Sequence, residues 1–172
     1  LLVFAKSGTN LPGKVHSGFY DQVTAIIETV ANEVTELAKV NPGLSVIITG
    51  HSKGAGMAPI AAYYLYANYG INAAQVYMFA APNPGNQAFA TAYNNQFPNT
   101  VSFANYQDIV PILPPSPLLA TALAIYCDSV LSAALLAMIV FDYEPVWGNN
   151  ENRNYIEQSA SFEQINLEVA YE

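Results

Sequence analysis

The stretch ITGHSKGAGMA, Ile48 to Ala58, decides the fold, because it sets one serine between two glycines at the junction of two different patterns. The residues before it read LSVII, a short β-branched run that is typical of a strand covered on both faces. The residues after it predict a helix over 54–69, although Pro59 removes one backbone donor there. The stretch therefore predicts a sharp strand-to-helix turn with Ser52 at its centre.

Strand and helix patterns alternate on both sides of this turn. Apolar residues recur every three or four positions from Phe19 to Leu37, which predicts an amphipathic helix that ends near Lys39. Residues 44–49, 75–80 and 100–105 read as strands, and residues 89–97 read as a helix between the last two. This alternation predicts an α/β fold with a largely parallel sheet flanked by helices, and the absence of internal repeats predicts one domain over residues 1–172.

Composition excludes several classes of function. Hydrophobic residues make up 52% of the chain and charged residues 10%, which excludes general disorder. The formal charge of −8 repels phosphate backbones and argues against a nucleic-acid partner. The single cysteine, Cys127, has no companion for a disulfide or a metal site. We expect no metal and no organic cofactor, because the serine chemistry considered next needs only side chains and backbone amides.

The position of Ser52 makes it a candidate nucleophile. Gly50 and Gly54 supply the room that such a tight turn needs, and the turn holds the hydroxyl at the carboxyl end of the sheet, where α/β folds bind ligands. The backbone N–H of Lys53, at the start of the helix, would face a developing oxyanion. The alternative is an ordinary N-cap serine in a glycine-rich turn.

A serine nucleophile also needs a carboxylate and a general base. Asp108 follows the predicted strand over 100–105, in a loop stiffened by the prolines that come after it; the alternative is an aspartate that only caps this loop. The two histidines are poorly placed as bases. His51 adjoins Ser52 in a turn where neighbouring side chains diverge, and His16 precedes the serine, against the order serine, acid, histidine.

Four blocks follow one another along the chain: KVHSGFYD at 14–21, ITGHSKGAG at 48–56, FAAPNPGNQAFA at 79–90 and NYQDIVPILPP at 105–115. In these blocks the chain resembles the class 3 lipases, the α/β-hydrolase family of fungal-type triacylglycerol lipases. It departs from the family at Lys53, where the family has leucine, and at Ala81 and Asn83-Pro84 in the third block. The resemblance implies Ser52 as the nucleophile and Asp108 as the acid of a catalytic triad.

The resemblance also implies a fold that is incomplete at both ends. The family strand that carries the oxyanion-hole Ser or Thr is expected upstream of Leu1, and the catalytic histidine is expected downstream of the last strand patterns. The segment FDYEPVWG, residues 141–148, resembles a family strand, and the alternation over residues 165–171 reads as a last strand or as the approach to the histidine.

An apolar insertion spans residues 118–140 with one charge, Asp128. It is long enough to cross a bilayer as a helix, but the central charge and the lack of flanking Lys or Arg argue against stable transmembrane anchoring. The other interpretations are a helix or helical hairpin buried against the core, and an apolar flap that contacts lipid.

The resemblance implies hydrolysis of lipid esters through a serine nucleophile and an acyl-enzyme, in the manner of a triacylglycerol lipase acting at a lipid–water interface. Two alternatives stay open within enzymes, a phospholipase A1 and a feruloyl-type esterase on the same scaffold. A third is a non-catalytic lipid-binding domain that lacks the base. Family resemblance favours an extracellular location, and the sequence leaves the oligomeric state open.

Overall fold

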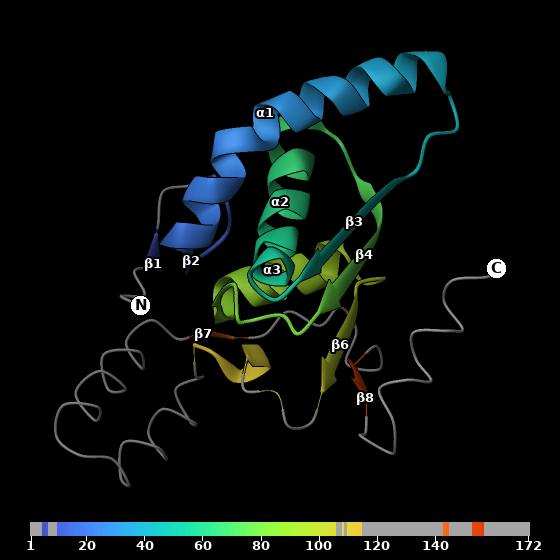
Figure 1. Cartoon of the computed structure of the whole chain (residues 1–172). Coiled ribbons are helices and arrows are strands. Elements are labelled where there is room, and N and C mark those ends of the chain that lie inside the picture. The colour runs from blue at the N-terminus through green and yellow to red at the C-terminus, as the bar shows by residue number, and fades with distance from the viewer. Residues whose placement is uncertain are drawn as a thin grey trace, which may run out of the picture.

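The computed structural model describes residues 5–6, 10–105, 108, 110–114, 143–144 and 153–156 (Figure 1). For residues 5–6, 143–144 and 153–156 it describes the backbone alone. The described residues form two small sheets and three α-helices. The predicted α/β fold is confirmed, while the prediction of one domain over all 172 residues stays a prediction.

The larger sheet holds four parallel strands in the order β3-β4-β6-β8 (Figure 1). Three of them lie within two residues of a predicted strand, and β8 was not predicted. Because parallel neighbours end at the same edge of a sheet, the carboxyl ends of β3, β4 and β6 lie side by side. The strands are β3 Val46–His51, β4 Ala73–Phe79, β6 Val101–Asn105 and β8 Arg153–Ile156.

The three α-helices confirm the three helix predictions, and they are α1 Ser17–Val40, α2 Lys53–Tyr69 and α3 Gln87–Gln96. α1 begins after His16, whose side chain accepts a hydrogen bond from the backbone N–H of Phe19. α2 ends at Gly70, which takes the left-handed conformation with φ of 66° that glycine tolerates best. A short 3₁₀ turn, η1 Val110–Ile112, follows the end of β6.

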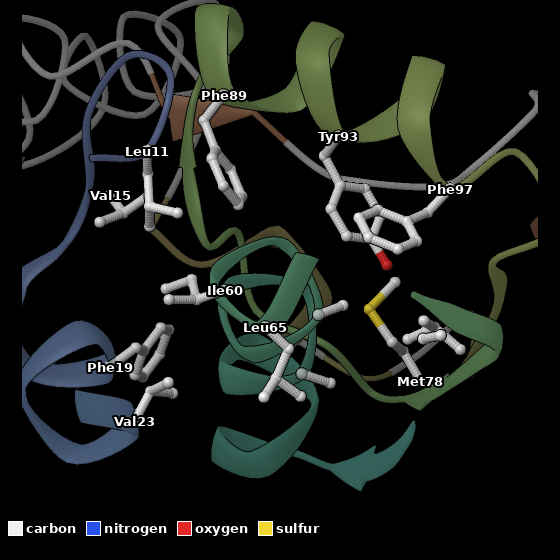
Figure 2. Close-up of a cluster of buried hydrophobic side chains, with 14 of the residues drawn as sticks. Leu11, Val15, Phe19, Val23, Ile60, Leu65, Met78, Phe89, Tyr93 and Phe97 are labelled. Carbon is white, nitrogen blue, oxygen red and sulfur yellow. The ribbon is translucent and has the colours of Figure 1, made fainter. Parts of the chain in front are cut away.

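The core lies around α2, which packs against α1 and against β3 and β4, and side chains of α3 join the same cluster (Figure 2). Phe19 and Val23 of α1 point toward Ile60 of α2 in this view, while Phe89 and Tyr93 point in from α3. The side chains of Val23, Ile60, Phe89 and Tyr93 are almost completely buried. Burial of this apolar surface is the main term that holds the helices on the sheet.

A second, antiparallel sheet in the order β1-β2-β5-β7 was not predicted from the sequence. Its strands are only two residues long, which is too short for a periodic pattern to appear. β7 falls inside the segment 141–148 that we interpreted as a strand. The four strands are β1 Ala5–Lys6, β2 Val15–His16, β5 Gly85–Asn86 and β7 Tyr143–Glu144.

The prediction that the strand over 44–49 is covered on both faces is wrong. Side chains along β3 alternate between half-buried and exposed, and Ile47 is 60% exposed while Ile48 packs against the core. α2 covers one face of β3, and the described residues leave Ile47 and Thr49 open on the other. A continuous apolar run in the sequence is therefore compatible with a strand that the described residues cover on one face only.

The apolar stripe predicted for α1 is only partly buried. Phe19, Val23, Ile27 and Ala31 face the core, whereas Leu37 in the last turns is 50% exposed. Figure 1 shows the reason, because the far end of α1 extends past α2. The insertion over 118–140 and the alternating segment over 165–171 lie outside the described residues. Within the described ranges, no helix is both long and apolar enough to cross a membrane.

Candidate active site

Ser52 lies between the last residue of β3 and the first residue of α2, at the predicted corner. Its backbone has φ of 53° and ψ of −122°, a conformation that L-residues rarely adopt and that costs about 1–3 kcal/mol. Although Ser52 occupies the N-cap position, its side chain makes no capping hydrogen bond to α2. This geometry argues against the alternative of an ordinary N-cap serine. Helix capping therefore does not explain the strained backbone of Ser52.

The turn is crowded at Gly50 and open at Gly54. A Cβ built on Gly50 would lie 2.4 Å from the carbonyl oxygen of Gly54 and 2.7 Å from the backbone nitrogen of Ala55. Gly50 therefore has to be a glycine for β3 to approach the first turn of α2 so closely. A Cβ on Gly54 would meet no atom of the described chain within 4 Å, so the steric argument made from the sequence applies to Gly50 alone.

Hydrogen bonds between strand ends fix the corner to its neighbours. The backbone N–H of Ser52 donates to the carbonyl of Phe79 at the end of β4, with N···O 2.8 Å. The N–H of Ala80 donates in the same way to Phe103 of β6, at 2.8 Å. Ala80 also has a positive φ, 52°, so the chain turns sharply there as it leaves β4. The residues that follow β3 and β4 are therefore each held to the next strand of the sheet.

Asp108 lies in the loop after β6, at the same edge of the sheet as Ser52, with β4 between their two strands. Its backbone N–H donates to the carbonyl of Asn105 at 3.1 Å. Its carboxylate oxygen Oδ1 accepts a hydrogen bond from the N–H of Val110 at 2.9 Å. The side chain is half-buried and held by this turn, which is compatible with both the triad acid and the loop-capping aspartate of the sequence analysis.

Neither histidine takes part in the contacts described above for Ser52 and Asp108. His16 caps α1, its ring stacks on Phe19 with centroids 4.0 Å apart, and its side chain is buried. Burial lowers the pKa of His16 below its ordinary value, and a backbone hydrogen bond partly offsets this. His51, the last residue of β3, is exposed. Within the described ranges, His16 serves as the N-cap of α1, and Oδ1 of Asp108 accepts from the backbone N–H of Val110.

The start of α2 supplies the donor side of the site. Lys53 is the first residue of α2, and the N–H at the first position of a helix has no carbonyl four residues before it within the helix to accept its hydrogen bond. Such a group is suited to bind an anionic oxygen. Its side chain is exposed, so the departure from leucine at this position leaves the backbone donor unchanged. In the part of the chain that the structure describes, no three His, Cys, Asp or Glu side chains gather at a metal-binding distance.

A cavity of about 330 Å³ lies away from these residues. It is lined by the residues that precede and begin β4 and by those that precede β6, from Asn72 to Val76 and from Gln96 to Thr100. These are the amino ends of parallel strands, whereas Ser52 and Asp108 follow the carboxyl ends. The cavity therefore does not belong to the candidate site.

One residue at the site was not singled out from the sequence as a functional candidate. Asn83, in the loop after β4, is only 3% exposed and forms two hydrogen bonds to the segment after Asp108. The sequence signal was the Asn83-Pro84 dipeptide, which marks a turn but does not reveal the long-range partner of its amide.

Three comparisons with known proteins agree on one family. The family model described as lipase (class 3) matches residues 3–117. The secreted mono- and diacylglycerol lipase A of Penicillium cyclopium is 34% identical over 100 residues, which is 56% of this chain and 31% of the relative. The chain thus spans about a third of the length of the curated relatives it matches.

Solved structures show the same fold. A triacylglycerol lipase whose catalytic centre is formed by a serine protease triad superposes with a TM-score of 0.61 at 32% identity, covering 67% of this chain and 45% of that one. M37 lipase superposes with a TM-score of 0.68 over 86% of this chain and 53% of that one. Its identity of 19% supports the fold alone.

Proposed function

We propose that this chain, which belongs to the class 3 lipase family, is part of an enzyme that hydrolyses carboxylic esters of lipids with Ser52 as its nucleophile. The observation that carries the proposal is the backbone of Ser52, which is held at a positive φ at the carboxyl edge of the sheet without capping its helix. Strain of this kind needs a reason, and presenting an uncapped hydroxyl for attack supplies one.

The chemistry divides ester cleavage into two steps. The Oγ of Ser52 attacks the ester carbonyl carbon while its proton passes to a general base, and the N–H of Lys53 stabilises the resulting oxyanion. Collapse of this intermediate breaks the ester bond, and the alcohol leaves with the proton from the base. Water then attacks the acyl-enzyme by the same route, which releases the fatty acid and restores the hydroxyl.

Asp108 is the proposed acid of the triad. Its role is to hold the base in the correct tautomer and to stabilise the cation that forms when the base takes the serine proton. The base is a histidine outside this sequence, since His16 is used as the N-cap of α1 and His51 is exposed at the end of β3. The reaction needs no metal and no organic cofactor, because the triad and the backbone amides supply the charges it requires.

The names of the relatives support one substrate class. The similar proteins are named as mono- and diacylglycerol lipases and as triacylglycerol lipases, which supports an acylglycerol for this chain. Several of them are named as secreted, which supports an extracellular location. A phospholipase A1 or a feruloyl-type esterase is separated from this proposal by comparing hydrolysis of triolein, phosphatidylcholine and a feruloyl ester.

A fluorophosphonate probe tests the nucleophile directly, because it reacts with an activated serine and forms a stable adduct. We expect the full-length protein to be labelled and the Ser52→Ala variant not to be. Ser45→Ala is the matched control, since Ser45 is an exposed serine in the loop before β3 and its loss should leave labelling unchanged. Equal labelling of wild type and Ser52→Ala would remove Ser52 from the mechanism, and a wild type that is never labelled would favour the lipid-binding alternative.

A further inference from the structure

The loop between β4 and β5, residues 80–84, lies between the two segments that carry Ser52 and Asp108, and it is fixed to the body of the protein at both ends. At its start, the N–H of Ala80 donates to Phe103 of β6 at 2.8 Å. At its end, the carbonyl of Pro84 accepts from the N–H of His16 at 2.8 Å. Since β6 and the start of α1 are both parts of the packed core, this loop is a rigid reference point for the site.

Asn83 joins this rigid loop to the segment after Asp108 through two hydrogen bonds. Its backbone N–H donates to the carbonyl of Leu113 at 2.7 Å, and its side-chain Nδ2 donates to the carbonyl of Pro114 at 2.7 Å. The residue is 3% exposed, so water does not compete for these bonds. The two bonds to adjacent carbonyls fix both the position and the direction of this segment.

The bonding continues from that segment to the carboxylate. The N–H of Leu113 donates to the carbonyl of Val110 at 3.0 Å, and the N–H of Val110 donates to Oδ1 of Asp108 at 2.9 Å. A series of hydrogen bonds therefore runs from the backbone N–H of Asn83 through Leu113 and Val110 to one oxygen of the candidate triad acid, and the side-chain Nδ2 of Asn83 holds the carbonyl of Pro114, the next residue of the same segment. A shift of the 110–114 segment would be transmitted to Asp108 by this series.

The oxygen of the Asn83 side-chain amide shows which atom of that side chain is needed. Its Oδ1 is buried and has no hydrogen-bond partner among the described residues, and a buried oxygen without a partner is destabilising. A residue that only filled space would be better replaced by an apolar one of similar size. The Nδ2 that reaches Pro114 is thus the group of this side chain whose hydrogen bond stabilises the segment.

From these contacts we propose that Asn83 is a positioning residue that sets the place of Asp108 in the catalytic site. It acts through the 110–114 segment and does not touch the reacting atoms. The proposal rests on the proposed function for the role of Asp108, while the mechanical part, that Asn83 holds the segment, stands on the hydrogen bonds alone. Neither the family comparison nor the sequence pattern assigns a role to this residue.

Asn83→Asp is the sharpest test, because it keeps the shape of the side chain and removes the Nδ2 donor. We expect kcat for ester hydrolysis by the full-length protein to fall by about 10- to 100-fold, since small displacements of a catalytic group have effects of this size. KM should stay within about threefold, because the interaction lost acts on the transition state and not on substrate binding.

Asn86→Asp is the matched control. It makes the same chemical change three residues further along the chain. The Oδ1 of Asn86 accepts hydrogen bonds from the N–H of Lys14 at 2.9 Å and from the N–H of Phe89 at 3.3 Å. An aspartate at this position keeps that acceptor. We expect its kcat to stay within about twofold of wild type, because aspartate is as good an N-cap as asparagine. Asn83→Ala is the second variant, to be used where the buried carboxylate of Asn83→Asp prevents folding.

Hydrogen exchange of the backbone N–H groups of Val110, Ile112 and Leu113 tests whether Asn83 holds the 110–114 segment, and it needs no activity measurement. Faster exchange in Asn83→Ala, with wild-type exchange in α2, supports the proposal, and unchanged exchange over 110–114 overturns it. A wild-type kcat in both Asn83 variants also overturns it, as does an equal fall in Asn86→Asp. Failure of the proposed function has a different signature, the equal labelling of wild type and Ser52→Ala by the fluorophosphonate probe.

Discussion

At the residue scale, Gly50 is the position where the candidate site depends most directly on the absence of a side chain. A methyl group there would lie 2.4 Å from the oxygen of Gly54, well inside van der Waals contact with backbone that cannot move aside. The end of β3 would have to draw back from the start of α2, and Ser52 lies between them. The cost falls on stability and on the geometry of the nucleophile at once.

We therefore expect Gly50→Ala to lower the free energy of unfolding by about 1–3 kcal/mol, the usual range for overpacking. Gly54→Ala is the control, because a Cβ there meets no described atom within 4 Å and alanine favours a helix. It should leave stability within about 1 kcal/mol of wild type. Urea unfolding measures both, and a cost for Gly54→Ala as large as that for Gly50→Ala would show that the turn is not limited by this contact.

The corner at Ser52 could be predicted from the sequence because its signal is local. A β-branched run, a glycine-flanked serine and an alanine-rich segment follow each other without interruption, and each favours its own local structure. The role of Asn83 could not be predicted in this way. Its side-chain partner, Pro114, is 31 residues away, and no periodicity or dipeptide pattern encodes a hydrogen bond over that separation.

At the element scale, α1 begins at a residue that can lose its capping function when the pH falls. The Nδ1 of His16 accepts a hydrogen bond from the N–H of Phe19 at 3.4 Å, which requires that this nitrogen carry no proton. A protonated imidazole would lose the acceptor and place a positive charge at the positive end of the helix dipole. Burial lowers the pKa of His16 in the same direction.

The sign of the pH dependence follows from this shift. Because the pKa of His16 is lower in the folded chain than the ordinary histidine value of 6.5, the unfolded chain binds more protons between the two values. The contribution of His16 to stability is therefore complete above about pH 6.5 and is lost as the pH falls through the folded-state pKa. Urea unfolding at several pH values should show this loss in wild type.

His16→Asn isolates the effect of this one residue. Asparagine is a good N-cap and does not titrate, so the part of the pH dependence that belongs to His16 should disappear while α1 keeps its cap. The comparison subtracts the carboxylates, which titrate in both proteins. Identical pH profiles for wild type and His16→Asn would contradict the assignment.

The helices were easier to predict than the strands, for a physical reason that these elements show. α1 has 24 residues and α2 has 17, so several turns repeat the same spacing and each boundary was predicted within about two residues. β2 and β5 have two residues each and exist because Val15 pairs with Gly85, a contact between distant parts of the chain. Elements that are made by a long-range partner leave no pattern in their own sequence.

At the scale of the whole molecule, the described sheet has one packed face and one open face. Ile48, Val76 and Met78 face the helices, while Ile47 and Phe79 on the other face are 60% and 40% exposed. In the described sheet β3 is also an edge strand. Its sequence, VIITGH, has none of the lysines or prolines that protect edge strands against pairing with another chain. The exposed apolar side chains continue through Leu37, Val40 and Leu44, just before this strand.

Such a surface promotes association, because burying apolar side chains and pairing an outer strand both lower the free energy. We expect the isolated 172-residue chain to self-associate as its concentration rises, and Ile47→Lys to weaken this. The substitution places a charge on the open face next to the outer edge. Because Ile47 is 60% exposed, its replacement should change the free energy of unfolding by no more than about 0.5 kcal/mol.

Ile48→Lys is the matched control, one residue along the same strand and on the opposite face. Ile48 packs against the core, so a charge there should cost more than about 2 kcal/mol in unfolding free energy. Sedimentation velocity measures the association and urea unfolding measures the stability. Since a one-residue step along a strand exchanges the two faces, opposite results for these neighbours would locate the association surface on the open face. Unchanged association in Ile47→Lys would place that surface elsewhere on the molecule.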